Sequence, residues 1–306
     1  MTTSHAAHSS SAAGLEGRLA ELAAAVDRRL PELLPAAADR PHAVHQAMHH
    51  ALTAPGKRLR PVLTLAVAEM LGQASAPVVD LGCAIEMVHA CSLVLDDLPA
   101  MDDAQLRRGR PTVHRAFGED VAVLAAFALF NRGYAVLVEA GSRLKLRRYA
   151  VADLAHHLAA AIGTDGLIGG QALDLTSREA DLDLELLEYI HSHKTGALFL
   201  AAAELGAMAA DARRRELEAV SRYAKNLGLA FQISDDLLDV VATSAQTGKD
   251  SDQDRRKVTF VKLLGVDGAQ ALAGELLDFA VAALDPLGRK ADPLRALALF
   301  VKQRAK

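Results

Sequence analysis

Apolar residues recur at intervals of three and four positions from about Leu15 onward, as in the stretch "LEGRLAELAAAVDRRLPELL". This spacing gathers them along one side of an α-helix, where they can face a common core. We find no Asn-Gly turn between alternating strands, which is the strongest short-range signal of a β-hairpin. The pattern therefore predicts an all-α fold.

Glycine and proline mark the boundaries between the expected helices. No Pro/Ser/Gly-rich linker divides the chain after its first 14 residues, MTTSHAAHSSSAAG, which we expect to form a disordered tail. We therefore predict a single all-α domain over residues 15–306. The boundaries fall at Pro55-Gly56, at 72–77, at Pro99, at 109–111, at Gly141, at 163–170 and at 243–248.

The composition is that of a globular protein with a sizeable core, since 51% of the 306 residues are hydrophobic and 24% are charged. A net charge of −4 gives no indication of nucleic-acid binding. No uninterrupted apolar run reaches about 18 residues, so we expect no membrane span. The two cysteines, Cys83 and Cys91, fit neither a disulfide framework nor a metal motif. We expect them to be reduced, in a cytoplasmic protein.

A cluster of aspartates lies at the end of an apolar segment in "SLVLDDLPAMDDAQLRRGRP", residues 92–111. Pro99 would break a continuing helix. We therefore expect Asp96 and Asp97 to close that helix and Asp102 to come from the turn after it.

The same pattern occurs again in "FQISDDLLDV", residues 231–240. Asp235 and Asp239 are four positions apart, so both carboxylates lie on one helix face, flanked by Asp236. Like charges at this spacing destabilise an isolated helix by roughly 0.2–0.5 kcal/mol per pair. Two such clusters indicate that a cation binds there.

Ligands that are all carboxylate oxygens favour a hard cation, and Mg²⁺ is expected before Ca²⁺ because neither cluster has the spacing of a calcium loop. Mg²⁺ held by carboxylates commonly also holds phosphate. We therefore predict two aspartate clusters that face each other across a cavity and bind a diphosphate, with the apolar helices forming a pocket for a hydrophobic tail. The chain offers phosphate-binding cations in "GKRLRP" at 56–61, "RRGRP" at 107–111, "HSHKTG" at 191–196 and "GKDSDQDRRK" at 248–257.

These segments resemble the motifs of the trans-prenyl diphosphate synthases, the polyprenyl synthetase family. The resemblance extends in order from about residue 47 to about residue 265. Leu95 stands where many members of the family have His, and Ala126-Phe127 stand where many have Gly-Asp. Both departures resemble the bacterial geranylgeranyl diphosphate synthases, so the resemblance is closest to them. The motifs are "APGKRLRP", "LDDLPAMDDAQLRRGRPTVH", "GLIGGQALDL", "HKTGALF", "FQISDDLLD" and "GKDSDQDRRKVTF".

The resemblance implies an isoprenoid synthase fold, a single helical bundle around a central apolar cavity. It also implies a homodimer and three Mg²⁺ ions per active site. The activity would be the condensation of isopentenyl diphosphate with an allylic diphosphate.

The resemblance also assigns a role to each matching residue. The implied Mg²⁺ site consists of Asp96, Asp102, Asp235 and Asp239. Asp96 and Asp102 would bind two ions with support from Asp97, and Asp235 would bind the third, with Asp236 and Asp239 in its outer shell. The residues expected to carry catalysis are Asp96, Asp97, Asp102, Arg107, Lys194, Asp235 and Lys249. The allylic diphosphate would be bound by Arg107, Lys194, Thr195, Gln232, Lys249 and Lys257, with Gln171 and Asp174 beside the first metal cluster. Isopentenyl diphosphate would be bound by Lys57, Arg60, His89 and Arg108.

Cys91 and Ser92 lie one helical turn before Asp96 and are expected to face the growing hydrophobic tail. Both side chains are small, so the pocket should stay open beyond fifteen carbons. The next candidates for a floor are Met87 and Phe127. We therefore expect mainly the twenty-carbon geranylgeranyl diphosphate, with farnesyl diphosphate as the alternative product.

Two other function classes remain as alternatives. A terpene cyclase also ionises diphosphates with Mg²⁺, but "DDLLD", "GKRLRP" and an aromatic content of only 4% argue against it. A non-catalytic regulatory subunit would lose its metal motifs, and this chain keeps both.

Overall fold

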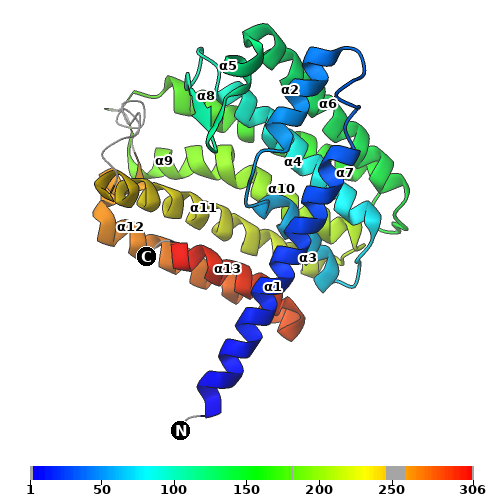
Figure 1. The fold of residues 1–306 in the computed structure, drawn as a ribbon. Coiled ribbons are helices and arrows are strands. Elements are labelled where there is room, and N and C mark those ends of the chain that lie inside the picture. Colours follow the sequence, from blue (N-terminus) through cyan, green and yellow to red (C-terminus); the bar gives the residue numbers. More distant parts are fainter. Residues whose placement is uncertain (1–2, 179, 181, 246–258, 305–306) are drawn as a thin grey trace.

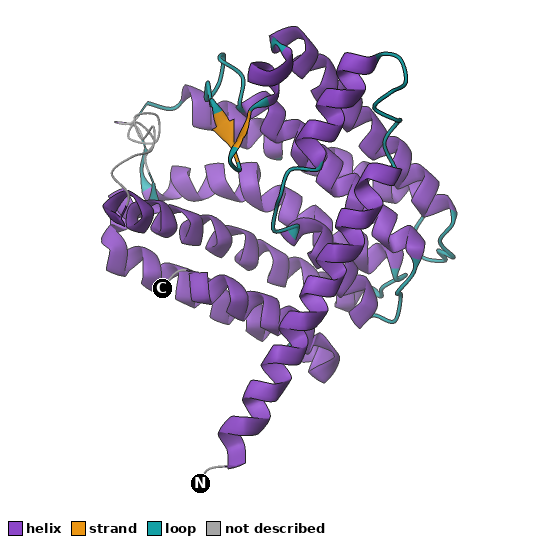
Figure 2. Ribbon diagram, viewed as in Figure 1, coloured by secondary structure: helices purple, strands orange, loops and turns teal. Residues whose placement is uncertain are grey.

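The computed structural model describes residues 3–178, 180, 182–245 and 259–304, and these are mostly helical, with helices joined by loops (Figure 2). The predicted all-α fold is confirmed. In chain order the elements are α1 (Thr3–Glu32), α2 (His42–Leu52), α3 (Leu59–Met70), α4 (Ala76–Asp96), β1 (Leu106–Arg107), β2 (Arg110–Pro111), α5 (Val113–Phe117), α6 (Glu119–Ser142), α7 (Val151–Ile162), α8 (Leu167–Thr176), α9 (Leu184–His191), the π-helical turn η2 (Ser192–Gly196), α10 (Ala197–Ala209), α11 (Arg214–Ala245), α12 (Phe260–Ala283), the 3₁₀ segment η4 (Asp285–Ala291) and α13 (Asp292–Arg304).

Helix α4 forms the centre of the main core. It begins after Ser75 with a proline in its first turn, where the missing N–H costs no hydrogen bond. It ends at Asp96, before Pro99, as the sequence predicts. Helix α6 approaches it closely at Gly133, because a Cβ there would lie 3.0 Å from the carbonyl oxygen of Ala84. The apolar side chains of α4 are therefore enclosed by neighbouring helices.

Helices α11, α12 and α13 lie side by side on one side of the molecule, with α10 next to α11 (Figure 1). On the other side, α4 packs against α3, α6 and α10. The C-terminal end of α4 and the C-terminal half of α11 both border the space between these two parts, since Asp96 and Asp235 line the same cavity. This arrangement positions the two aspartate clusters relative to each other.

Although the sequence carries no Asn-Gly hairpin signal, residues 106–111 form a short hairpin in which β1 pairs antiparallel with β2. The two residues of the turn, Arg108 and Gly109, have φ of 53° and 76°. Positive φ at both central positions gives the backbone twist that two-residue hairpins favour. Arg108 and Gly109 therefore take the places that Asn and Gly usually occupy in such a turn. The strands have two residues each, which is too short for alternating apolar and polar residues to be recognised in the sequence.

Helix α1 starts at Thr3, and Figure 1 shows its first turns projecting beyond the rest of the bundle. Disorder of residues 1–14 stays a prediction. By length and composition alone, α4 and α6 could each cross a membrane. The apolar window of α4 is 72% buried inside the protein and that of α6 only 39%. Helix α4 therefore resembles a core helix, whereas part of α6 has an unusually apolar outer face.

Candidate active site

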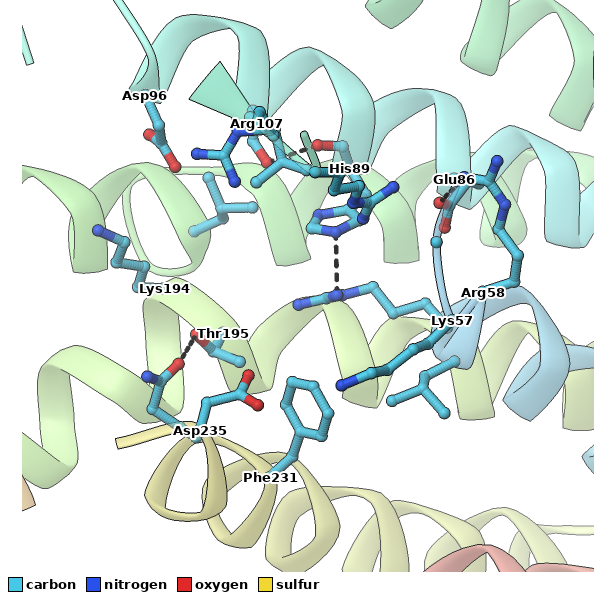
Figure 3. Close-up of a pocket in the computed structure, with 18 of the residues that line it drawn as sticks. Lys57, Arg58, Glu86, His89, Asp96, Arg107, Lys194, Thr195, Phe231 and Asp235 are labelled. Carbon is cyan, nitrogen blue, oxygen red and sulfur yellow. Dashed lines mark hydrogen bonds and ion pairs between the residues drawn. The ribbon is translucent and has the colours of Figure 1, made fainter. Parts of the chain in front are cut away.

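One cavity of about 650 Å³ collects most of the predicted site residues. Its wall is built by the loop before α3, by α3, α4, the hairpin, α8, η2 and α11. Figure 3 shows it with an acidic end, near Asp96 and Asp235, and a basic end, near Lys57 and His89. The predicted residues in the wall are Lys57, Arg60, His89, Ser92, Asp96, Arg107, Arg108, Gln171, Lys194, Thr195, Gln232 and Asp235.

The first aspartate pair is divided between two tasks. Asp96 is the last residue of α4 and lines the cavity. The carboxylate of Asp97 is 3% exposed and accepts hydrogen bonds from Nε and Nη2 of Arg107, at 2.8 and 2.6 Å. Burial alone would lower the pKa of Arg107, but Asp97 raises it above its usual value. Asp97 therefore fixes a cation at the edge of the cavity.

The second pair is divided in the same way. Asp235 lines the cavity, whereas Asp236 is buried. The carboxylate of Asp236 accepts a hydrogen bond from the side-chain amide of Gln232 at 3.0 Å and another from the backbone N–H of Phe260 at 3.0 Å. Gln232 in turn accepts one from the hydroxyl of Thr195 at 2.9 Å. Asp236 thus connects the start of α12 to the cavity wall.

The π-helical turn η2 carries Lys194 and Thr195 to the acidic end of the cavity. A Cβ on Gly170 of α8 would lie 2.2 Å from the backbone nitrogen of Lys194, so only glycine allows this contact. On the other side, a Cβ on Gly228 of α11 would lie 3.1 Å from the Cα of Gly196. The ammonium of Lys194 binds the carboxylate of Asp174 at 2.5 Å. Short π-helical turns commonly mark functional sites.

The basic end brings together Lys57, Arg60, His89 and Arg108. Burial, followed by the charge of Arg60 and Arg108, lowers the pKa of His89 well below 6.5, so the ring is neutral. Its Nε2 can therefore accept a hydrogen bond from Nη1 of Arg60, at 3.2 Å. Burial lowers the pKa of Arg60 to about 10 despite the nearby Glu86 and Asp235. The arginine is still charged at neutral pH and lies where an anion would stabilise it.

Arg58 is a structural residue of this site that the sequence does not distinguish from Arg60. It adopts a left-handed backbone conformation, with φ of 49°, immediately before α3. Its buried guanidinium donates to Glu86 and Asp27 at 2.7 Å each. It also donates to the carbonyl oxygens of Leu52 and Ala54, at 2.9 Å each. These bonds fix the loop that presents Lys57.

Of the residues expected to limit the length of the product, some line the cavity and others lie elsewhere. Ser92 lines the cavity, while Cys91 and Met87 are buried in the main core. Phe127 is 67% exposed on the outer face of α6, so its assignment as a floor of the pocket is wrong for this chain. Helix α6 turns that position away from α4. Leu167 and Phe231 also line the cavity, and no pattern in the sequence had assigned them a role.

Four further predicted residues lie beside the cavity or outside the described part. The backbone N–H of Asp102 donates to the carbonyl oxygen of Asp96 at 2.9 Å, which places Asp102 next to the end of α4. The side chain of Asp239 lies outside the described residues, as do Lys249 and Lys257.

The donor atoms at the acidic end fit Mg²⁺. They are carboxylate oxygens, which this ion prefers, and the cavity also holds the buried Oε1 of Gln171 without a hydrogen-bond partner. An acceptor in this position suits a water molecule on a metal ion. Among the described residues, no three side chains already converge as a closed metal site. Mg²⁺ commonly completes its shell with phosphate oxygens and water, so an open arrangement of carboxylates is compatible with it.

Comparison with known proteins supports a single family. Residues 41–281 match the model of the polyprenyl synthetase family. A chloroplastic geranylgeranyl pyrophosphate synthase of Capsicum annuum is 41% identical over 290 residues, which are 93% of this chain and 77% of that protein. Geranylgeranyl pyrophosphate synthase 4 of Arabidopsis thaliana is 40% identical, covering 91% of this chain and 75% of that protein.

Solved structures show the same fold. An FPP/GFPP synthase from Zymomonas mobilis superposes with a TM-score of 0.82 at 35% identity, covering 95% of this chain and 99% of that one. A geranyltransferase from Legionella pneumophila superposes with a TM-score of 0.85 at 29% identity, covering 96% and 99%.

Proposed function

Because the chain belongs to the polyprenyl synthetase family, we propose that it joins isopentenyl diphosphate to an allylic diphosphate and extends the product to geranylgeranyl diphosphate. One observation carries this proposal: a single cavity has carboxylates and cations at one end and an independent set of cations at the other. Two diphosphates can therefore bind at opposite ends with their hydrocarbon parts between them.

At the acidic end, the allylic diphosphate would contact Lys194, Arg107 and Thr195. Asp96, Asp102 and Asp235 would hold Mg²⁺, which when bound supplies positive charge to the leaving diphosphate. Asp97 holds Arg107 in place through Nε and Nη2, so the remaining N–H groups of the guanidinium can donate to phosphate oxygens. Fixed cations of this kind stabilise charge that develops as the carbon–oxygen bond breaks.

At the basic end, Lys57, Arg60 and Arg108 would hold the diphosphate of isopentenyl diphosphate. Its double bond then attacks the allylic carbon, and the electron pair of the broken carbon–oxygen bond stays with the departing diphosphate. That diphosphate then accepts a proton from the newly extended chain. Leu93, Leu167 and Phe231 contribute apolar surface to the wall of the same cavity. An apolar wall limits the access of water to the allylic cation.

The proposed product length rests on the small side chain at position 92 and on the relatives. Ser92 leaves the wall beneath the acidic end without a large ring. The curated relatives from pepper and Arabidopsis are named geranylgeranyl pyrophosphate synthases. Farnesyl diphosphate remains the alternative, since the Zymomonas structure is that of an FPP/GFPP synthase.

The outer face of α6 supports a homodimer. Leu124, Phe127 and Val138 are 56%, 67% and 45% exposed, and their spacing aligns them along one side of this helix. Exposed apolar stripes of this kind usually pack against another protein surface. A second copy of this chain would cover it.

The test is a product assay with purified protein, Mg²⁺, isopentenyl diphosphate and dimethylallyl, geranyl or farnesyl diphosphate in turn. We expect prenyl diphosphates that end at twenty carbons, no product without isopentenyl diphosphate, and loss of activity with EDTA. Hydrocarbons formed from an allylic diphosphate alone would instead identify a terpene cyclase. No conversion of any substrate pair would support a non-catalytic subunit.

A further inference from the structure

The guanidinium of Arg60 lies over the ring of Phe199. Its central carbon is 4.6 Å from the ring centre, which is within the range of a cation–π interaction. Phe199 is on α10 and is 1% exposed, whereas Arg60 is on α3. The contact therefore joins the basic end of the cavity to α10, a helix that supplies no cation to it.

Arg60 has an unusual set of partners for an enclosed cation. Among the described residues no carboxylate forms an ion pair with it, although the charges of Glu86 and Asp235 reach it from a distance, and its Nε is buried without a hydrogen-bond partner. Its side-chain hydrogen bond is to the neutral ring of His89. Arg58, two residues earlier, is instead paired with Glu86 and Asp27. A partly buried cation that has no ion pair is costly, so the ring face of Phe199 supplies stabilisation that carboxylates supply to Arg58.

The ring of Phe199 is itself held in position. It contacts the ring of Phe231 at a centroid distance of 5.2 Å and an angle of 45°. Behind it, a Cβ on Gly228 would lie 3.2 Å from the Cβ of Phe199, so α11 approaches closely there. The Phe199 ring cannot turn away from Arg60 without displacing one of these neighbours.

We propose that Phe199 is a positioning residue, which holds the Arg60 guanidinium at the basic end without neutralising its charge and so sets the affinity for the diphosphate of the non-allylic substrate. A carboxylate in the same place would compete with that diphosphate, whereas a ring face does not. The inference rests on the proposed function, because it takes the basic end as the isopentenyl diphosphate site.

The test compares Phe199→Leu, Arg60→Gln and the double variant with the wild type. Phe199→Leu should raise the KM for isopentenyl diphosphate about five- to thirtyfold, the range between an exposed and a desolvated cation–π contact, and leave the KM for the allylic substrate unchanged. In the Arg60→Gln background the same change should have little further effect, because the two residues act as a unit. Phe199→Met, which keeps the apolar volume, should behave like Phe199→Leu.

A matched control is Phe130→Leu, which removes a half-buried ring of α6 that packs against Tyr134. It should leave both KM values unchanged. If Arg60→Gln raises the KM for isopentenyl diphosphate but neither Phe199 variant does, or if the Phe199 and Arg60 effects simply add, the positioning role is wrong and the proposed function stands. If Arg60→Gln leaves that KM unchanged, the assignment of the basic end is itself wrong.

Discussion

Arg107 binds the carboxylate of Asp97 through Nε and Nη2, whereas the adjacent Asp96 lines the cavity. The same division occurs between Asp235 in the cavity wall and the buried Asp236. Each aspartate pair therefore contributes one carboxylate to the cavity and uses the other to fix its surroundings.

Asp97→Asn should separate these tasks. It removes the charge that pairs with Arg107, so we expect the free energy of unfolding to fall by about 1–2 kcal/mol, below the full value for a buried pair because Arg107 is 35% exposed. Turnover should fall less than in Asp96→Asn. Denaturant unfolding and steady-state kinetics measure the two effects. The control is Asp103→Asn on the same loop, where the side chain is 52% exposed. Equal losses of turnover for positions 96 and 97 would contradict the division.

Gly170→Ala should impair the site from outside the cavity. The added Cβ would meet the backbone of Lys194 at 2.2 Å, so η2 must move away from α8. We expect turnover to fall at least about tenfold, because small displacements of positioned groups have large kinetic effects. Gly274→Ala is the matched control, since a Cβ there meets no atom within 4 Å, and it should stabilise α12 by about 0.5–1 kcal/mol. Wild-type kinetics for Gly170→Ala would show that η2 does not need this close contact.

His157 should make the stability of the protein depend on pH. Its bond to Glu204, at 2.8 Å, raises the pKa of His157 above 6.5 in the folded state. The resulting stabilisation is fully present below pH 6.5 and is lost as the pH rises through the folded-state value. The melting temperature of His157→Gln should therefore lie further below wild type at about pH 5.5 than at about pH 9. The matched control is His156→Gln, on the exposed side of α7. A difference that grows with pH would be inconsistent with the assigned pair.

Product length should respond to bulk at Ser92. A phenylalanine there would occupy cavity volume directly, so Ser92→Phe should shift the product from twenty toward fifteen carbons with metal dependence intact. Cys91→Phe should also shorten the product, because the added ring would push core residues toward the cavity. Since Cys91 is buried in the main core, this overpacking should lower the free energy of unfolding by about 1–3 kcal/mol. Chromatography of dephosphorylated products distinguishes the outcomes. A wild type that already stops at fifteen carbons, or two variants with unchanged products, would show that another wall limits the chain.

Much of the fold and part of the site could be predicted from the sequence. Helical periodicity is repeated over most of the chain, so the all-α class was accessible. The position of Pro99 correctly predicted the end of α4 at Asp96. The repeated aspartate pairs correctly indicated two segments that meet at one cavity, which Asp96 and Asp235 now line. These features depend on local spacing, which a sequence shows directly.

Features that depend on long-range contacts could not be predicted. Arg58 and Arg60 differ in role because the left-handed backbone at position 58 directs one guanidinium to Glu86 and Asp27. The contact of Phe199 with Arg60 joins two helices far apart in the sequence. Phe127 was misplaced because apolar periodicity does not show which face of α6 meets the core. The hairpin was missed because its strands have two residues each.

We propose that carboxylates from two distant segments jointly hold the metal ions of one catalytic cavity. The most direct test is the Mg²⁺-dependent turnover of Asp235→Ala beside that of Asp96→Ala, with melting temperature as the control for folding. We predict that each variant loses at least about 100-fold in turnover, as expected when a group that stabilises the leaving charge is removed, while the melting temperature stays close to wild type. Near-normal turnover of Asp235→Ala, with Asp96→Ala inactive, would contradict the claim.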